Sequence, residues 1–351
     1  MLALAIAAGA LADDNASVPS LTPWAAKLVK DNLPICSAEA KVKHVALQHK
    51  LPANLIGEMV RVESPRQSCE GQWIVVTSAE GGFYMGIPWF LDDVKDAGTL
   101  ENKLKNFGWK NLQQHFLPLI DRTKTRDGLY RVVLQQTTER GTMPLEGEID
   151  PEGTVFFIGH FVSLKSDVRS ERLKNFGPFV ANSPVTGAAK PEVTVIEFSD
   201  FECPACMRAS GYVKPLLEKY GDKLRYVRYD LPLVQMHPWA FSAAVAGRAI
   251  YRQKPDVFWE FKKHIYENQE KLSAFTIDDF ARGFAQDHEL DLKKYDADVA
   301  SPELRAEIMK GAGVAFANDV RSTPTYVING VIVDAGDGTN LDKYVAGLLK
   351  K

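Results

Sequence analysis

Two cysteines separated by two residues, Cys203 and Cys206, are the side chains whose spacing most directly suggests chemistry. They follow an apolar, β-branched run at 193–199 and precede a helical pattern that begins at Pro204. A helix N-terminus points unpaired backbone N–H groups at a nearby sulfur, and a thiolate rather than a thiol attacks a disulfide. We therefore expect Cys203 to be an exposed nucleophile with a low pKa, and Cys206 to resolve the mixed disulfide.

Two other uses of this cysteine pair fit the sequence poorly. A zinc site usually needs two Cys or His pairs at short spacing, and neither the other two cysteines nor the seven histidines form such a second pair. A purely structural disulfide that closes so short a loop would add little stability. The sequence thus predicts a redox-active dithiol, with no metal and no cofactor.

The remaining cysteines, Cys36 and Cys69, both lie in the N-terminal half. An even number of cysteines in an oxidising compartment favours pairing, so we expect a structural disulfide that closes a loop of about 33 residues. The alternative is a second redox pair that relays electrons between the two halves.

The elements that must position the C-x-x-C pair begin after a segment at 182–191 that is rich in Pro, Gly, Ala and Ser, as is typical of a linker. The pattern then predicts, in order, a buried strand (193–199), a helix interrupted at Pro215 (204–221), a second strand (224–234), helices broken near 254 and 287 (238–309), a hairpin across Asn329-Gly330 (323–334) and a closing helix (340–351).

Four stretches of this region resemble one known family: "IEFSDFECPAC", "HPWAFSAAVAGRA", "FWEFKKHIYENQ" and "STPTYVINGV". With the strand before the cysteines and the Thr-Pro hairpin far downstream, residues 192–351 resemble the DsbA-like branch of the thioredoxin-fold thiol oxidoreductases. The resemblance implies an α/β thioredoxin-like fold with a helical insertion, and it makes this region the catalytic domain.

The resemblance also implies roles for residues around the cysteines. Family members carry an acidic residue at the place of Glu197, beneath the second cysteine, where it could relay the proton of Cys206; the alternative is an outward-facing carboxylate. The Thr323-Pro324 bond is expected to be cis and to pack against Cys203, with the Thr323 backbone presented to an extended client. The alternative is a trans proline that begins an edge strand.

Neighbouring polar residues are expected to have simpler roles. The Pro204-Ala205 spacer lacks the histidine of the most oxidising family members, which implies a less extreme reduction potential. Asp200 and Glu202 are expected to be exposed, and His237 is expected to cap a helix or to pack.

The N-terminal half, residues 20–181, is predicted to be a smaller α+β domain. Helical patterns and strand patterns alternate along it, with helices near 37–50 and 99–118 and strands at 72–79, 128–139 and 153–164. The stretch that begins at Glu148 is loosely similar to sheet segments of DsbC- and DsbG-like two-domain proteins. That similarity implies a role in dimerisation or client binding.

The first twelve residues, "MLALAIAAGALA", are apolar and end in the small-x-small pattern of a signal-peptidase site. The alternative is a hydrophobic tail without a targeting role. We expect an exported protein in the periplasm or another extracytoplasmic compartment. A formal net charge of −3 without a basic stretch argues against a nucleic-acid partner.

Together these features predict an exported thiol–disulfide oxidoreductase that exchanges disulfides through its C-P-A-C dithiol. Its expected partners are cysteine-containing exported proteins and a membrane redox partner that reoxidises or reduces the dithiol. One alternative is a disulfide isomerase that works as a homodimer through its N-terminal domain. The other is a holdase or binding module with auxiliary redox activity.

Overall fold

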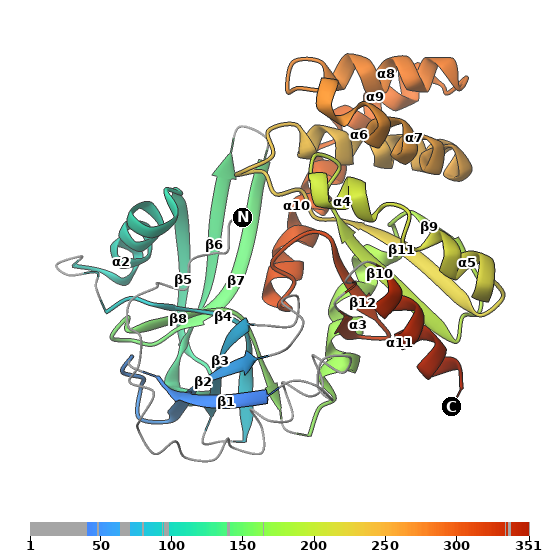
Figure 1. The fold of residues 1–351 in the computed structure, drawn as a ribbon. Coiled ribbons are helices and arrows are strands. Elements are labelled where there is room, and N and C mark those ends of the chain that lie inside the picture. The colour runs from blue at the N-terminus through green and yellow to red at the C-terminus, as the bar shows by residue number, and fades with distance from the viewer. Residues whose placement is uncertain are drawn as a thin grey trace.

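The computed structural model describes residues 41–47, 49–63, 71–78, 81–92, 94, 98–138, 141–163, 165–333, 335 and 338–350. The predicted signal peptide at 1–12 and the predicted Cys36–Cys69 disulfide lie outside these residues. The described chain forms two sheets that lie side by side, with helix α10 (Pro302–Ala317) packed between them (Figure 1).

In the described ranges the N-terminal sheet contains eight antiparallel strands in the order β1-β2-β3-β4-β8-β7-β6-β5. They are β1 (Lys41–Ala46), β2 (Leu55–Glu63), β3 (Gly71–Ser78), β4 (Gly82–Phe90), β5 (Phe116–Lys124), β6 (Tyr130–Thr138), β7 (Gly141–Ile149) and β8 (Val155–Ser163). The helical elements of this half are α2 (Leu100–Phe107), a π-helical turn (Gly108–Leu112), a 3-10 turn (Arg126–Gly128) and α3 (Val168–Val180).

The helix predicted near 37–50 is wrong over its described residues. Residues 41–46 form β1, an edge strand that pairs antiparallel with β2. Their sequence, KVKHVA, explains the difference because its valines favour an extended backbone. The three strands predicted for this half are present as β3, β6 and β8.

The helix predicted near 99–118 is shorter than expected. Thr99 caps its N-terminus, because its hydroxyl accepts a hydrogen bond from the backbone N–H of Asn102 at 3.2 Å. Helical structure ends at Leu112, and Phe116 already begins β5. The aromatic stretch of β4 belongs to the core, since Phe83 and Trp89 are buried.

The C-terminal sheet has five described strands in the order β13-β12-β10-β11-β9. They are β9 (Val185–Gly187), β10 (Val193–Ser199), β11 (Leu224–Asp230), β12 (Thr325–Ile328) and β13 (Val331–Val333). Strands β10 and β11 are parallel, and the other pairs are antiparallel. Apolar side chains from helices pack on both faces, so this half has the predicted thioredoxin-like fold.

The helices of this half are α4 (Pro204–Ala209), α5 (Lys214–Tyr220), α6 (Ala240–Gln253), α7 (Pro255–Asn268), a 3-10 turn (Gln269–Lys271), α8 (Ile277–Asp287), α9 (Leu292–Ala300), α10 and α11 (Thr339–Leu349). The predicted break near 254 separates α6 from α7, and the one near 287 separates α8 from α9. Asn329 and Gly330 turn the β12–β13 hairpin with positive φ angles of 46° and 84°.

Part of the segment predicted to be a linker, 182–191, belongs to the C-terminal sheet. Residues 185–187 form β9, which pairs antiparallel with the outer side of β11. The backbone N–H of Arg228 also donates to the carbonyl oxygen of Pro184 at 2.9 Å. The exposed edge of β11 offers unpaired backbone groups, and a three-residue strand is enough to satisfy them.

The two halves share one hydrophobic core. Trp89, Leu145 and Ile158 of the N-terminal sheet belong to the same buried cluster as Phe198 of β10 and Ile308 of α10. Figure 1 shows α10 lying against β7, the strand of the first sheet nearest to it.

Close backbone approach marks the contact between α10 and β7. A Cβ atom at position 313 would overlap the carbonyl oxygen of Pro144, so only glycine fits there without displacement. The guanidinium of Arg321 also donates to the carbonyl oxygen of Gly86 at 2.9 Å. The halves therefore form one packed body.

Helices α6 to α9 form the insertion that the pattern predicts between β11 and β12 (Figure 1). Their apolar side chains pack around Phe201, Cys203 and Cys206, so the insertion covers the cysteine turn. Among the helices of the described chain, none combines the length and the apolar character that a membrane crossing requires.

Candidate active site

Cys203 is the N-cap residue of α4, directly after the turn that ends β10. The expectation that this cysteine is exposed is wrong, because the helical insertion packs around it and leaves it 7% exposed. Its backbone is extended, with φ −71° and ψ 119°, and Pro204 occupies the first helical position. The helix begins there because a proline at this position has no N–H to lose and its φ is already helical. Backbone N–H groups of the first turn therefore point toward the Cys203 sulfur.

The two thiols have opposite acidities. The pKa of Cys203 is lowered to about 5, chiefly because the Cys206 thiol donates a hydrogen bond to its sulfur. Thr323 and the backbone N–H groups of Ala205 and Cys206 lower the pKa of Cys203 further, against burial, which raises it. The pKa of Cys206 is raised well above its usual value, first by burial and then by the charge and hydrogen bond of Cys203.

The loop before β12 forms the other wall of the site. The Thr323-Pro324 peptide bond is cis. The Cys203 Sγ atom lies 3.5 Å from the carbonyl oxygen of Thr323. The buried Thr323 hydroxyl forms no hydrogen bond of standard geometry with another described group, so it remains available to the sulfur.

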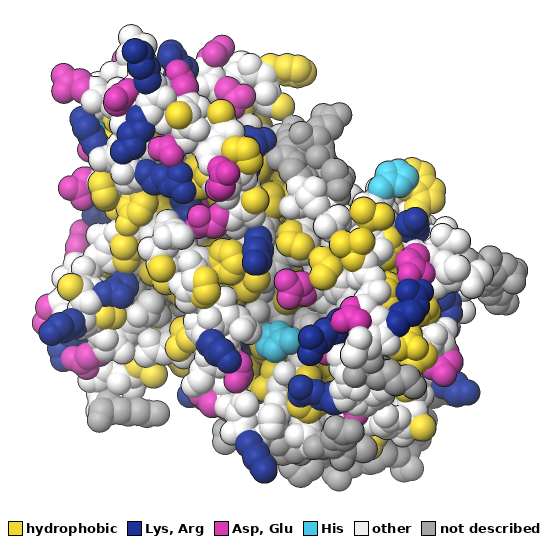
Figure 2. Space-filling view, turned by 180° about the vertical axis from the view of Figure 1, so that it is seen from behind, with side chains coloured by type: hydrophobic (Ala, Val, Ile, Leu, Met, Phe, Trp, Pro, Cys, Tyr) yellow, Lys and Arg dark blue, Asp and Glu magenta, His cyan; other side chains and the backbone are white. Residues whose placement is uncertain are grey.

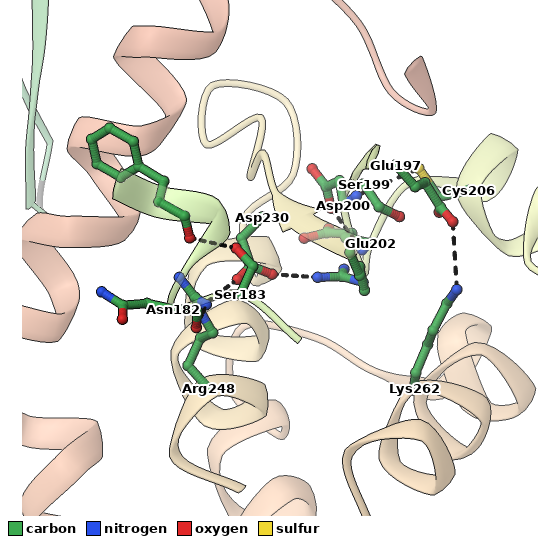
Figure 3. Close-up of polar contacts among 12 residues, drawn as sticks. Asn182, Ser183, Glu197, Ser199, Asp200, Glu202, Cys206, Asp230, Arg248 and Lys262 are labelled. Carbon is green, nitrogen blue, oxygen red and sulfur yellow. Dashed lines mark hydrogen bonds and ion pairs between the residues drawn. The ribbon is translucent and has the colours of Figure 1, made fainter. Parts of the chain in front are cut away.

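Glu197 is fully buried on β10, on the Cys206 side of the site. The Tyr226 hydroxyl donates to its Oε2 atom, and the Lys262 Nζ atom lies 3.6 Å from the same oxygen. Lys262 also donates to the Tyr226 hydroxyl at 2.9 Å, and burial lowers the pKa of its ammonium. Figure 3 shows Glu197 beside Cys206, with Lys262 reaching the carboxylate from α7.

Asp200 and Glu202, expected to be exposed, instead have acceptor roles in the fold. Asp200 is 1% exposed, and its carboxylate accepts from the backbone N–H groups of Glu202 and Leu233, both at 2.8 Å. The Glu202 carboxylate accepts from the N–H groups of Trp239 and Ala240, at 2.6 and 3.0 Å. The expectation is wrong because the loop before α6 packs against the cysteine turn, and the two carboxylates accept from its backbone N–H groups.

A second group of buried charges adjoins the Glu197 group through Arg228, which pairs with Glu197 in the strand register. Figure 3 shows Arg248 beside Asp230, with which it pairs. Asp230 also pairs with Arg228, and Arg248 lies 3.2 Å from Glu307. The Arg228 guanidinium stacks over the Phe201 ring at 3.7 Å. These contacts join β11 to α6 and α10, so we assign them to the fold.

No group of three or more His, Cys, Asp or Glu side chains within the described ranges is arranged to hold a metal ion. The site consists of two thiols, one buried carboxylate with its lysine and tyrosine, and the Thr323 loop.

Comparison with known proteins places this site in a family. Residues 180–346 match the family model described as Thioredoxin. Over 163 residues the chain is 30% identical to the probable disulfide bond formation protein D of Bacillus cereus, covering 45% of this chain and 75% of that protein. The chain belongs to the DsbA-like thiol–disulfide oxidoreductases.

Other similarities of this DsbA-like chain cover less of the compared protein or are weaker. It is 34% identical over 149 residues to the Na(+)/H(+) antiporter NhaA 1 of Mycolicibacterium vanbaalenii, covering 42% of this chain and 23% of that protein. The chain thus spans about a quarter of the length of that relative. The structure of BdbD from Bacillus subtilis aligns with 20% identity and a TM-score of 0.43, covering 49% of this chain and 95% of that one.

The DsbA-like site brings together the predicted residues Cys203, Cys206, Glu197, Thr323 and Pro324. Cys36 and Cys69 lie outside the described residues, so their pairing stays a prediction.

Further residues of the DsbA-like site were not predicted from the sequence. Gln269, in the turn after α7, donates to the carbonyl oxygens of Phe201 and Cys203 at 2.8 and 3.2 Å. Lys262 and Tyr226 surround Glu197. Tyr226 lies on β11 two positions before Arg228, the residue that pairs with Glu197, so strand register could have supplied this signal. Lys262 gives no comparable signal, because it arrives from a distant helix.

Proposed function

We propose that this protein exchanges disulfides with client proteins through Cys203 and Cys206. The observation that carries the proposal is the opposite acidity of two thiols three positions apart. The pKa of Cys203, about 5, makes it a thiolate at neutral pH, whereas the raised pKa of Cys206 keeps that thiol protonated. A structural pair would not need this difference.

The reductive direction of the exchange proceeds in two displacements. The Cys203 thiolate attacks one sulfur of a client disulfide, so a Cys203–client S–S bond forms and the other client sulfur leaves as a thiolate. Cys206 then loses its proton and attacks the Cys203 sulfur, so the Cys203–Cys206 bond forms and the client thiolate is released. Two electrons pass from the dithiol to the client, and the reverse sequence oxidises a client dithiol.

Glu197 is the proposed acceptor of the Cys206 proton. Its Oε1 atom has no hydrogen-bond partner among the described groups, while Oε2 is held by Tyr226 and faces Lys262. The carboxylate is close enough to Cys206 for its charge to raise the pKa of that thiol, after the larger effects of burial and of Cys203. A base in this buried place can remove the proton without bulk water.

Reduction of insulin with a dithiol reductant tests the proposal against the holdase alternative. Cys203→Ala should abolish catalysed reduction, and Cys206→Ser should accumulate mixed disulfides with clients. Suppression of aggregation should survive Cys203→Ala if the protein is instead a holdase. Full insulin reduction by Cys203→Ala would contradict the proposed chemistry.

The N-terminal half is proposed to bind clients. A mainly apolar cleft of about 110 Å³ lies where the halves meet, and Trp89 and Phe116 line it from the N-terminal sheet. Leu233, Met236 and Arg321 line its other side, from the two loops that also border the cysteine turn. On the face shown in Figure 2, apolar side chains gather where the two halves meet.

The isomerase alternative requires a dimer through the same half. Light scattering on the full chain distinguishes the two proposals, because a client-binding monomer and a dimer differ twofold in mass. Scrambled ribonuclease refolding then measures isomerisation directly. The full chain is required, since removal of the N-terminal half would expose the shared core around Ile308.

Three further predictions belong to the proposal. Cys36 and Cys69 form a structural disulfide, the protein is exported, and a membrane redox partner reoxidises or reduces the dithiol. Mass spectrometry of protein isolated from the oxidising compartment should find Cys36 linked to Cys69 even when Cys203 and Cys206 are reduced. Two free thiols at Cys36 and Cys69 would contradict the pairing. A measured reduction potential would indicate whether the membrane partner oxidises or reduces the dithiol.

A further inference from the structure

The spacer between the two cysteines contains no histidine, yet a histidine from another loop lies next to the cysteine turn. His237 lies in the loop between β11 and α6, and its side chain is 14% exposed. Its Nδ1 atom is 2.7 Å from the Oδ2 atom of Asp200. The backbone N–H of His237 donates to the carbonyl oxygen of Leu233 at 2.9 Å. This hydrogen bond closes a turn in the loop that carries the imidazole.

Asp200 connects this imidazole to both cysteines. Its carboxylate is fixed by the backbone N–H groups of Glu202 and Leu233. Its carbonyl oxygen accepts from the N–H of Cys203 at 3.3 Å, and its own N–H points to the Cys206 sulfur at 3.5 Å. A residue with these contacts holds the imidazole and the cysteine turn in one arrangement.

The charges around His237 are negative. The hydrogen bond to Asp200 is the largest cause that raises the pKa of His237, and burial opposes it. The charges of Asp200, Cys203 and Glu202 raise the pKa further. The thiolate and the imidazole therefore interact electrostatically, and such an interaction stabilises both charged forms equally.

We propose that His237, held in place by Asp200, is the cation that stabilises the Cys203 thiolate. In this arrangement His237 acts on the sulfur through its charge, and Asp200 is a positioning residue. The inference rests on the proposed function in one respect, namely that Cys203 is the attacking thiolate.

The coupling has a consequence for each redox state. In the dithiol protein, the negative charge of the Cys203 thiolate favours the protonated form of the His237 imidazole. When the disulfide forms, two electrons and the Cys206 proton leave, and the negative charge on Cys203 is lost. The pKa of His237 must then be lower in the disulfide form than in the dithiol form.

Nuclear magnetic resonance titration of the His237 ring in both redox forms tests the coupling on the unaltered protein. We expect a difference of roughly half a unit to one unit between the two pKa values, higher in the dithiol form. His288 serves as an internal control, because its ring faces Glu260 and Phe284 in the helical insertion. The proposal would be overturned if the pKa of His237 were equal in the two redox forms, or if the pKa of His288 changed by the same amount.

Substitution gives the reciprocal measurement. In His237→Gln the titration of the Cys203 thiolate, followed by ultraviolet absorbance, should move up by the same roughly half to one unit. The equilibrium constant with glutathione should then change about three- to tenfold toward the disulfide. Asp200→Asn should reproduce part of this change, and His288→Gln should not. An unchanged Cys203 midpoint in a folded His237→Gln protein would contradict the proposal.

Failure of this coupling can be distinguished experimentally from failure of the proposed function. If wild-type protein fails to reduce insulin but His237 still responds to the redox state, the exchange proposal fails and the coupling stands. If insulin is reduced and His237 does not respond, only the coupling fails. Should Asp200→Asn not fold, the wild-type titration decides alone.

Discussion

The C-terminal sheet ends in a cluster of ionisable side chains, whereas the N-terminal sheet presents mainly apolar ones to the same neighbourhood. Glu197, Asp200 and the two thiols all lie on β10 or within seven positions of its end. The N-terminal wall of the cleft consists of apolar residues such as Trp89 and Phe116, with Gln114 and Gln136 as its polar members.

We propose that this difference reflects two tasks, exchange chemistry at the C-terminal sheet and client capture at the N-terminal sheet. Exchange chemistry requires fixed charges whose pKa values are set by burial and by one another. Capture of an extended client requires apolar area with few fixed polar groups. Because the two halves share a core, neither task is independent of the packing between them.

The packing between the two halves can be weakened by a substitution at Gly313. Gly313→Ala places a Cβ against the Pro144 carbonyl oxygen, so we expect a loss of about 1–3 kcal/mol in the free energy of unfolding. Gly347→Ala in α11 is the matched control, since a Cβ there meets nothing within 4 Å and favours the helix. Denaturant titration should show one cooperative transition for both. Two separate transitions, or equal stability of both variants, would contradict a shared core.

The role of Glu197 in the C-terminal half can be tested by substitution. If its carboxylate accepts the Cys206 proton, Glu197→Gln should slow the resolution of mixed disulfides by about tenfold or more. If the carboxylate acts only through its charge, the same variant should resolve them faster, because that charge raises the pKa of Cys206.

Rapid quenching of the mixed disulfide measures the resolution rate. Removing the carboxylate alone leaves the Lys262 ammonium buried without its partner, which could destabilise the protein. The double variant Glu197→Gln/Lys262→Met removes both charges of this pair and is therefore the control for that destabilisation. Faster resolution in both variants would exclude the relay.

The apolar half can be tested at Met236, which is 40% exposed at the cleft. Met236→Gln should raise the KM for a protein client by a few-fold while leaving exchange with a small aromatic disulfide unchanged, because only the client reaches the cleft. Phe275→Gln removes a 95% exposed apolar side chain elsewhere and should change neither. Equal effects on both substrates would argue against client binding in the cleft.

Local signals explain what the sequence could predict. The C-x-x-C pair before a proline-led helix, and Asn329-Gly330 between two β-branched runs, are each specified by neighbouring residues. The misassigned β1 and the hidden strand β9 are short edge strands, whose extended form depends on a partner far along the chain. The segment 182–191, which contains β9, is rich in Pro, Gly, Ala and Ser and has no apolar periodicity that would reveal such pairing.

The acceptor roles of Asp200 and Glu202 could not be predicted for a related reason. Asp200 and its partners Leu233 and His237 are more than 30 positions apart, and burial arises only when the loop before α6 folds over the turn. An acidic residue near a cysteine is most simply expected in solvent. Tertiary packing reversed that expectation.

Titration of the thiolate absorbance against pH tests the central claim most directly. The dithiol protein should show one thiolate with a midpoint at about 5 that disappears in Cys203→Ser and persists in a shifted position in Cys206→Ser, which loses the thiol donor. Alkylation of Cys203 should accordingly stay fast down to about pH 6 and fall as the pH passes through the midpoint. A Cys203 midpoint near the ordinary thiol value of about 8.5 would contradict the account.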